Sequence, residues 1–393
     1  MNSPASAARQ PHATRLALLS LLLGNFFTGI SVLSPSAMMS ELSSNLGVTI
    51  PKAGLLITFG GVVLTIGSPL MAWLASRADR RLLLAATMFA CAALHAAMAF
   101  APEYFSLLAL RLAMLAVVAL FTPQAAAVVA LIEPDPARRA GAISLVFLGW
   151  SLAVAIGLPL ITLFTHQIGW RVTLALFAVS MFLCALLLLR ALPEKLFAAP
   201  VSLSTWVLVA RNPFMLLVLL ITVLQTSGQF HIFPYIEPLA MKLAGATPGE
   251  VGVLFAIFGI TGFIGNVIAA RIVGGLGPMK TSVIFLGLIF LGILVWAFGA
   301  HYFVMLALGA MLWGMGFAAA NSMQQARLVG AAPALAGATV ALNTSALYIG
   351  QAVGSGISGL LYSRGDFDAI GFSAAAFVAA SITVAVLFTR GVR

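Results

Sequence analysis

The feature that most constrains the fold of this chain is a succession of long apolar segments joined by short polar connections. A window of about 19 residues finds twelve of them. Each can form a helix that crosses a hydrocarbon core of about 30 Å, and they lack the alternation of a barrel strand. With 62% hydrophobic and 8% charged residues, the chain is too apolar for a soluble domain. We therefore predict an all-α integral membrane protein. The segments are 15–40, 52–75, 81–100, 104–132, 140–164, 169–190, 212–240, 250–273, 280–299, 302–327, 335–362 and 370–390.

The basic residues orient these segments in the membrane. If the twelve spans are correct, fifteen of the 20 Lys and Arg residues face one side and four face the other. Short loops rich in Lys and Arg stay in the cytoplasm, so the first side is cytoplasmic. An even number of spans then places both termini there. The net charge of +10 is thus explained by topology, and we expect no nucleic-acid partner.

An internal repeat divides the chain into two halves. The stretch GSPLMAWLASRADRRLLL at 67–84 has a degraded copy, GNVIAARIVGGLGPMK, at 265–280. PARRAGAISLVF at 136–147 corresponds more loosely to PALAGATVALNT at 333–344. Duplicated halves of this kind are typical of transporters that alternate access to a site near the membrane midplane.

The repeat predicts two six-helix bundles. The N-terminal bundle comprises residues 1–190 and the C-terminal bundle residues 212–393. Residues 191–211 form the one long cytoplasmic connection, with two prolines, and serve as the linker. Within it, 205–211 is a candidate interfacial helix.

Several classes of protein are excluded. No phosphate-binding Gly-Lys-Ser/Thr loop is present, which argues against an ATP-driven pump. No nucleophile, base and orienting acid come together in the pattern, so we do not expect an enzyme. We also expect no metal and no cofactor. Cys91 and Cys184 fall within apolar spans and are interpreted as packing residues.

Five stretches carry a resemblance to a known family. They are LGVTIPKAGLLITF at 46–59, SPLMAWLASRADRRLLL at 68–84, GWSLAVAIGLPL at 149–160, GWR at 169–171 and YIEP at 235–238. The chain resembles the major facilitator superfamily of the twelve-helix drug/proton antiporter type, and within it the bacterial sugar-efflux, arabinose-efflux and chloramphenicol-efflux group. The resemblance implies a bacterial inner-membrane transporter that exports a sugar or an amphipathic drug such as an amphenicol in exchange for protons.

The loop after the second span matches a superfamily motif that acts as a cytoplasmic latch. The resemblance implies that its acidic residue pairs with basic groups and helix ends and so holds one conformation. The usual aspartate position is Ser76 here, so Asp79 would have to substitute, beside Arg77, Arg80 and Arg81. Alternatively, the arginines only enforce topology.

The fifth span resembles the glycine-rich signature of antiporters. Gly149 and Gly157, with small residues between them, allow a neighbouring helix to approach closely. Pro159 removes a helical hydrogen bond and can kink the helix. Such a helix is suited to pivoting between two packings, although small-residue spacing is common in membrane helices.

Proton coupling requires titratable groups inside the membrane, and few are available. Relatives often carry a glutamate in the first span, where this chain has Val32. The candidates are Glu237, near Pro234 and Pro238 in an expected broken helix, and His231. The alternatives are that Glu237 is an interfacial glutamate and that His231 is a hydrogen-bonded buried histidine. Arg111 lies inside the fourth span and must face the protein interior. In similar antiporters this arginine influences proton transfer, but Arg111 could instead satisfy carbonyls between helices.

The substrate cavity is expected to be lined by polar and aromatic residues that point away from lipid. This mostly neutral, amide-rich set suits an uncharged polyol or an amphipathic drug better than a strong anion. The candidates are Asn25, Thr28, Gln124, Trp150, Gln225, Gln229, Tyr235, Asn266, Asn321, Gln324, Asn343, Tyr348 and Gln351.

Two other functions remain open. The missing acid in the first span permits a facilitator of a small polar solute that transports without protons. A receptor or assembly factor on the same scaffold is also conceivable, although no appended domain is present. For the transporter we expect a monomer whose partners are a small-molecule substrate, protons and the lipid bilayer.

Overall fold

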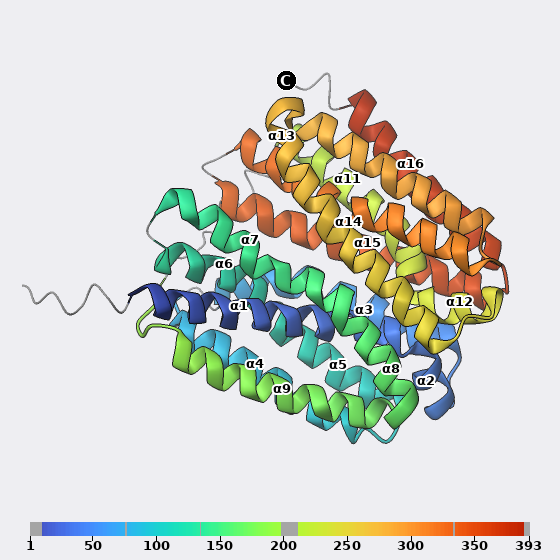
Figure 1. The fold of residues 1–393 in the computed structure, drawn as a ribbon, viewed down its shortest axis with the longest axis horizontal. Coiled ribbons are helices and arrows are strands. Elements are labelled where there is room, and N and C mark those ends of the chain that lie inside the picture. Colours follow the sequence, from blue (N-terminus) through green and yellow to red (C-terminus); the bar gives the residue numbers. More distant parts are fainter. Residues whose placement is uncertain (1–9, 75–76, 134, 198–210, 333–334, 389–393) are drawn as a thin grey trace, which may run out of the picture.

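The computed structural model describes residues 10–74, 77–133, 135–197, 211–332 and 335–388, and these contain helices and no β-strand. Blue-to-green helices of the first half occupy the lower part of Figure 1, and yellow-green-to-red helices of the second half occupy the upper part. The division into bundles of residues 1–190 and 212–393 stays a prediction.

The first half contains six long helical rods, three of which are interrupted. A proline lies at each of the three interruptions. Pro35 opens η1, Pro123 lies in the first turn of α6, and Pro159 opens α8. The elements are α1 (Gln10–Leu33), η1 (Ser34–Ala37), α2 (Met39–Asn45), α3 (Ile50–Leu74), α4 (Arg80–Ala99), α5 (Tyr104–Val118), α6 (Phe121–Ile132), α7 (Pro136–Leu152), the π-helical turn η2 (Ala153–Gly157), α8 (Leu158–Ile168) and α9 (Trp170–Ala191).

The second half repeats the plan with longer helices. Its elements are α11 (Pro213–Ile232), η3 (Phe233–Tyr235), α12 (Ile236–Ala244), α13 (Pro248–Phe298), α14 (Phe303–Ala331), α15 (Ala336–Ser363), α16 (Phe367–Thr383) and η5 (Val384–Phe388). The expected interfacial helix at 205–211 lies almost wholly outside the described residues.

The number of membrane spans depends on two helices. Ten helices in the described part of the chain are long and apolar enough to cross a membrane. One of them, α13, runs for 51 residues but contains Gly277 with φ 75° and ψ 159°, a conformation that glycine adopts without strain. The more polar α15, of 28 residues, is not among the ten. The count of twelve therefore stays a prediction that takes α13 as two spans and adds α15.

The two halves meet along two pairs of helices. On one side α3 packs against α15, and on the other η2 and α8 pack against α13. In the first interface the hydroxyls of Thr58 and Ser355 share a hydrogen bond of 2.9 Å, and Ser345 donates to the Thr65 carbonyl at 3.0 Å. In the second, Gly259 lies so close to Ala155 that a Cβ would overlap its backbone nitrogen.

The two ends of the bundle differ in which elements they hold. We call the end at which α1 begins and α9 ends the terminal end. The opposite end carries α2 and α12, which contact each other and lie to the right in Figure 1. We call it the α12 end. Cys91 and Cys184 are buried and unbridged, as predicted.

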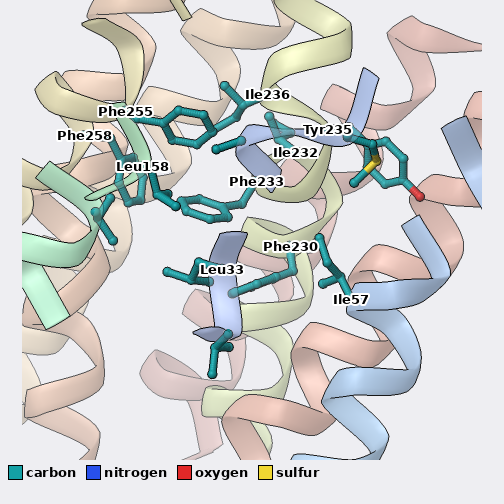
Figure 2. Packing of buried hydrophobic residues seen from close by; sticks show 14 of the residues in the cluster. Leu33, Ile57, Leu158, Phe230, Ile232, Phe233, Tyr235, Ile236, Phe255 and Phe258 are labelled. Atoms are coloured by element: carbon teal, nitrogen blue, oxygen red, sulfur yellow. The ribbon is translucent and has the colours of Figure 1, made fainter. Parts of the chain in front are cut away.

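An apolar cluster fills the junction of the halves near the α12 end. Phe233 of η3 lies centrally, with its ring centroid 5.3 Å from that of Phe258 on α13. Figure 2 shows Leu158 of α8 beside these rings and Leu33 of α1 beside Phe230. These residues are almost fully buried and belong to one cluster. Residues of both halves thus share one core, which we call the apolar seal.

Candidate functional site

The broken helix expected around Pro234 is present and places Glu237 between the halves. Helix α11 ends at Ile232, a 3-10 turn follows, and α12 begins at Ile236. Glu237 therefore lies in the first turn of α12, where unpaired backbone N–H groups favour a negative charge. Its side chain has an exposed fraction of 0%. The side chain is therefore enclosed by protein and does not face water.

Glu237 contacts two separate elements of the opposite half. The backbone N–H of Ser40 in α2 donates to Glu237 Oε2 at 3.0 Å. The other oxygen, Oε1, lies 3.4 Å from Nε2 of His166 in α8. A buried carboxylate needs such partners because an unpaired charge in an apolar interior is strongly unfavourable. The carboxylate consequently bridges the two halves at the α12 end.

His166 is held at this position by the end of its helix. Gly169 follows α8 with φ 82°, a left-handed conformation that ends the helix one turn after His166. The last turn of a helix favours a cation, so this position suits an imidazolium. The side chain is 23% exposed and thus reaches solvent while contacting the buried Glu237.

Arg111 is buried and bonded to main-chain carbonyls. Its Nε donates to Leu56 of α3 at 3.0 Å. Its Nη1 and Nη2 donate to Ser31 and Val32 of α1 at 3.1 and 2.8 Å. The guanidinium therefore ties α5 to α1 and α3, which agrees with the expected alternative that it satisfies carbonyls between helices.

His231 is completely buried within the second half. Its Nδ1 bonds the Ser227 carbonyl one turn earlier at 2.6 Å, and its ring lies 5.0 Å from that of Phe377 on α16. Nε2 has no hydrogen-bond partner among the described residues. One ring nitrogen is thus left without a hydrogen bond among the described residues, in a buried position between α11 and α16.

A chain of polar side chains links three helices of the first half. Thr122 on α6 donates to Asn25 Oδ1 on α1 at 2.7 Å. Trp150 on α7 donates its indole N–H to Thr122 Oγ1 at 3.1 Å, and Asn25 donates to the Val146 carbonyl at 3.2 Å. Thr122 and Trp150 are only partly buried. Their side chains therefore remain partly accessible while they bridge α1, α6 and α7.

The second half contains an equivalent chain. Thr222 on α11 donates to Asn343 Oδ1 on α15 at 2.7 Å, and Asn343 donates to Asn321 Oδ1 on α14 at 2.9 Å. Equivalent positions of the sequence repeat, such as residues 67 and 265, lie a constant number of residues apart. Asn25 and Thr222 have this separation to within one position, and so do Thr122 and Asn321. The same three helices of the plan are thus bridged in both halves, with one polar chain in each.

The other candidate lining residues are mostly engaged within the protein. Gln229 accepts from the Trp313 indole at 3.0 Å, and Gln324 donates to Ser282 at 2.7 Å. Tyr235 donates weakly to the Ser355 carbonyl at 3.4 Å. Buried positions are also occupied by Thr28, Gln124, Gln225, Tyr348 and Gln351, whereas Asn266 is partly buried and accepts from Ser322.

The fifth span packs closely on two sides, as its small residues suggest. A Cβ at Gly149 would overlap the Leu22 carbonyl of α1, and one at Gly157 would lie 2.9 Å from Ile30. Pro159 faces α13, with its Cα 3.7 Å from a Cβ placed at Gly252. The π-helical turn η2 precedes this proline, so the missing N–H is accommodated by a wider turn. The span thus contacts both its own half and the opposite one.

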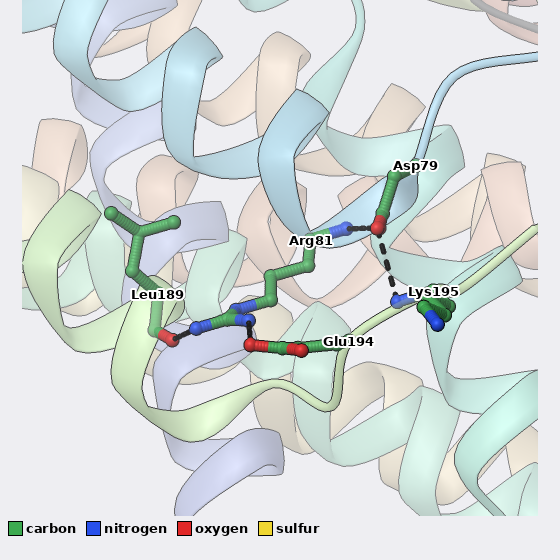
Figure 3. A network of polar contacts seen from close by, with 5 residues as sticks. All are labelled: Asp79, Arg81, Leu189, Glu194 and Lys195. Carbon is green, nitrogen blue, oxygen red and sulfur yellow. Dashed lines mark hydrogen bonds and ion pairs between the residues drawn. The ribbon is translucent and has the colours of Figure 1, made fainter.

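The loop after the second span forms a polar network that Figure 3 shows. Asp79 caps α4 by accepting from the Arg81 N–H, and its other oxygen accepts from the Lys195 N–H, both at 3.0 Å. Arg81 binds the Leu189 carbonyl and pairs with Glu194 at 2.7 Å. Arg80 is buried and Arg77 is exposed, whereas Ser76 lies outside the described residues. Asp79 therefore does bind a helix end, and the bonds named here lie within residues 79–195.

Sequence reasoning missed His166, Ser40, Thr122 and Thr222. The fifth span was expected to end at 164, which left His166 in a loop, whereas α8 continues to Ile168. Ser40 contributes through its backbone, which no side-chain pattern reveals. The described residues contain no group of three or more His, Cys, Asp and Glu side chains that could hold a metal ion.

Comparisons with known proteins agree with this architecture. Among curated relatives, the inner membrane transport protein YdhP of Escherichia coli K12 is 28% identical over 353 residues, which cover 88% of this chain and 89% of that protein. A protein of Mannheimia succiniciproducens named "Probable sugar efflux transporter" is 26% identical, with 88% and 87% covered. The expected resemblance to the sugar-efflux group is thereby confirmed.

Solved structures share the fold at lower identity. The peptide transporter POT, solved as a point mutant, superposes with a TM-score of 0.79 at 16% identity, over 96% of this chain and 95% of that one. A bacterial homologue of the human lysosomal transporter Spinster gives a TM-score of 0.74 at 14% identity, over 97% and 98%. The family model of the Major Facilitator Superfamily matches residues 21–237 and 218–393. The chain belongs to the major facilitator superfamily, and it is a multi-pass inner-membrane transporter rather than an enzyme.

Proposed function

We propose that this protein exports a small, uncharged molecule by proton antiport with alternating access. The observation that carries the proposal is Glu237, a fully buried carboxylate whose partners belong to the opposite half. A group that can bind a proton at a junction between moving halves links protonation to their relative position. We assign Glu237 as the proton acceptor, with both termini cytoplasmic and the monomer as the functional unit.

We propose that the substrate binds between the two polar chains. Each chain offers amide and hydroxyl groups, and the first adds the Trp150 ring. Hydroxyls and amides hydrogen-bond a polyol, and an aromatic ring packs on its apolar face or on an amphipathic drug. A sugar is favoured over an amphenicol because a curated relative is named a sugar efflux transporter. Asn25, Trp150, Asn321 and Asn343 are the assigned contacts.

Further roles follow from the contacts of the other candidates. His231 offers its free Nε2 as a second proton site. Arg111 would act through α1 and α3, whose carbonyls it holds, and its fixed charge would influence protonation nearby. We propose that Gly149, Gly157 and Pro159 form the pivot of the fifth span. The network of Asp79, Arg77, Arg80 and Arg81 is proposed as the latch of the terminal end.

An uncoupled facilitator is the second candidate. One observation favours it: the first helix has Val32 at the position where the family resemblance implies a frequent glutamate, and the Val32 carbonyl is bound by Arg111. Such a protein would equilibrate its substrate without consuming the proton gradient, and Glu237 would then serve only to join the halves.

The test uses everted membrane vesicles energised to an acidic interior, with a pH-sensitive dye as readout. A panel of sugars, nucleosides and amphenicols is added in turn. We expect one compound to dissipate the gradient in vesicles containing the protein and not in vesicles lacking it. No response to any compound, together with labelled uptake that ignores the gradient, would favour the facilitator. If Glu237→Gln and His231→Ala both leave transport sensitive to the gradient, the coupling site is wrong.

A further inference from the structure

We propose that His166 and Glu237 form a proton-released bolt that holds the α12 end of the two halves closed. The bolt rests on the proposed function, in which Glu237 is the proton acceptor, and adds a conformational role for His166. While Glu237 is ionised, its carboxylate joins α12 of the second half to α8 and α2 of the first. Protonation of Glu237 releases these contacts and allows the α12 end to separate.

The geometry supports a bolt because one side chain binds two elements at once. Glu237 Oε2 accepts from the Ser40 N–H at 3.0 Å, and Oε1 lies 3.4 Å from His166 Nε2. Opening the α12 end would separate α12 from α2 and α8 and would break both contacts. The two contacts of Glu237 therefore stabilise only the closed arrangement of the α12 end.

Protonation weakens the bolt for a simple electrostatic reason. A bond from an N–H to an ionised carboxylate is about twice as strong as one to a neutral acceptor. A neutral Glu237 would also lose its attraction to the imidazolium. Because His166 is 23% exposed whereas Glu237 is completely buried, the imidazole can exchange protons with water and pass them to the carboxylate.

The other charged and titratable groups around the bolt have distinct partners. Glu41 on α2 is a further acidic group at this end, and its Oε1 accepts from Asn45 Nδ2 at 2.9 Å. Tyr362 on α15 lies near the Glu237 carboxylate and stacks on Tyr235 at 5.5 Å. Lys242, on α12 itself, lies over the Phe367 ring at 4.4 Å. The direct ionic contact to Glu237 described here is therefore that of His166.

The apolar seal next to the bolt limits how far the bolt can shift the balance between the closed and the open α12 end. Phe233, Phe258 and Leu158 hold the halves together whatever the pH, because apolar burial does not depend on proton binding. The seal already favours the closed α12 end. The bolt therefore changes only the ratio of closed to open molecules, as a small, reversible switch requires.

The experiment measures the separation of the halves at the α12 end directly. Spin labels are attached to cysteines introduced at Ser44 on α2 and Gly249 on α13, both exposed positions. The native cysteines are buried and do not compete. Distance distributions are recorded between about pH 4 and 8.5, which covers the ordinary titration ranges of carboxyl and imidazole groups. We expect the shorter separation to predominate while the imidazole is protonated and the carboxylate ionised, and the longer separation to rise at the acidic end, where the carboxyl gains its proton.

Substitutions assign this response to the bolt. Glu237→Gln mimics the protonated acid, so the longer separation should rise about tenfold at pH 8 and lose its pH dependence. His166→Gln should raise it about threefold and flatten the pH dependence. His301→Gln is the matched control: His301 lies at the same end but bonds the Leu243 carbonyl within its own half, and it should leave the distribution unchanged.

The outcomes separate the bolt from the proposed function. Unchanged distances in Glu237→Gln at every pH overturn the bolt, and the antiport proposal survives if the dye assay still depends on Glu237. A pH-dependent separation that is lost in both variants supports the bolt even if no compound dissipates the proton gradient. If Glu237→Gln does not purify as a folded protein, an unchanged His166→Gln is sufficient to overturn the bolt.

Discussion

Two charged networks at opposite ends of the bundle show how similar groups serve different purposes. At the terminal end, Asp79, Arg81 and Glu194 join the start of α4 to the chain beyond α9, within the first half and the linker. At the α12 end, Glu237 joins both halves through His166 and Ser40. The first network is partly solvated, with Glu194 76% exposed, whereas the second surrounds a carboxylate with no exposure.

The difference shows that the consequence of a charge depends on what it connects. The described bonds of the terminal network lie within the first half and the start of the linker, so the proposed latch would act through the linker and not across the junction itself. The bonds of Glu237 cross the junction that would have to open under the proposed alternating access. Burial adds to this contrast, because solvent and salt screen an exposed pair and leave a buried one strong.

Charge reversal gives the largest expected contrast between the networks. Glu237→Lys places a cation beside His166 in a fully buried site, and we expect a loss of about 3 kcal/mol or more in stability. Glu194→Lys, the matched reversal at the terminal end, should cost at most about 1 kcal/mol because its side chain is mostly in water. Thermal unfolding in detergent measures both. Equal losses would mean that the two networks are energetically alike.

Wedging the junction near the α12 end should have the next largest effect. A side chain at Gly259 meets the Ala155 backbone of the opposite half, so Gly259→Leu should force the halves apart and lower transport about tenfold. Gly287 lies on the same helix with open space around it, and Gly287→Leu should retain transport within about twofold. Substrate efflux from cells checks both. Full activity in Gly259→Leu would show that this close contact is dispensable.

Loosening the terminal network should expose the linker while leaving the junction intact. Arg81→Ala removes the bonds to Leu189 and Glu194, and we expect trypsin cleavage after Lys195 to rise about threefold to tenfold. Arg138→Ala is the control, because its guanidinium is exposed and pairs only locally with Asp135. Unaltered cleavage in Arg81→Ala would indicate that other contacts hold this segment.

Salt provides the smallest and most selective test. Raising ionic strength from about 0.1 M to 1 M shortens the screening length from about 10 Å to 3 Å. The exposed Arg81–Glu194 pair should lose a few tenths of a kcal/mol, seen as a lower melting temperature that Arg81→Ala does not share. The spin-label distances at the α12 end should not move. A salt-induced separation there would show that Glu237 is more accessible than its burial indicates.

The sequence predicted much of the architecture and part of the site. The length of the apolar segments predicted the helices, the repeat predicted two halves, and the prolines predicted the break before Glu237. The expected end of the fifth span was four residues too early, because the polar stretch Thr165–Gln167 resembles a loop when burial is unknown. His166 was lost for that reason. The paired polar chains were predicted as single residues and not as bonded sets.

The sequence by itself determined that this chain is an all-α membrane protein, since hydrocarbon admits few backbone structures and apolar length is visible in the order of residues. Only the tertiary structure decided which groups meet across the halves. Glu237, Ser40 and His166 are brought together by three separate elements, and no local pattern encodes that contact. A charge acquires its role from its neighbours and its solvent exposure, and the packed chain alone supplies both.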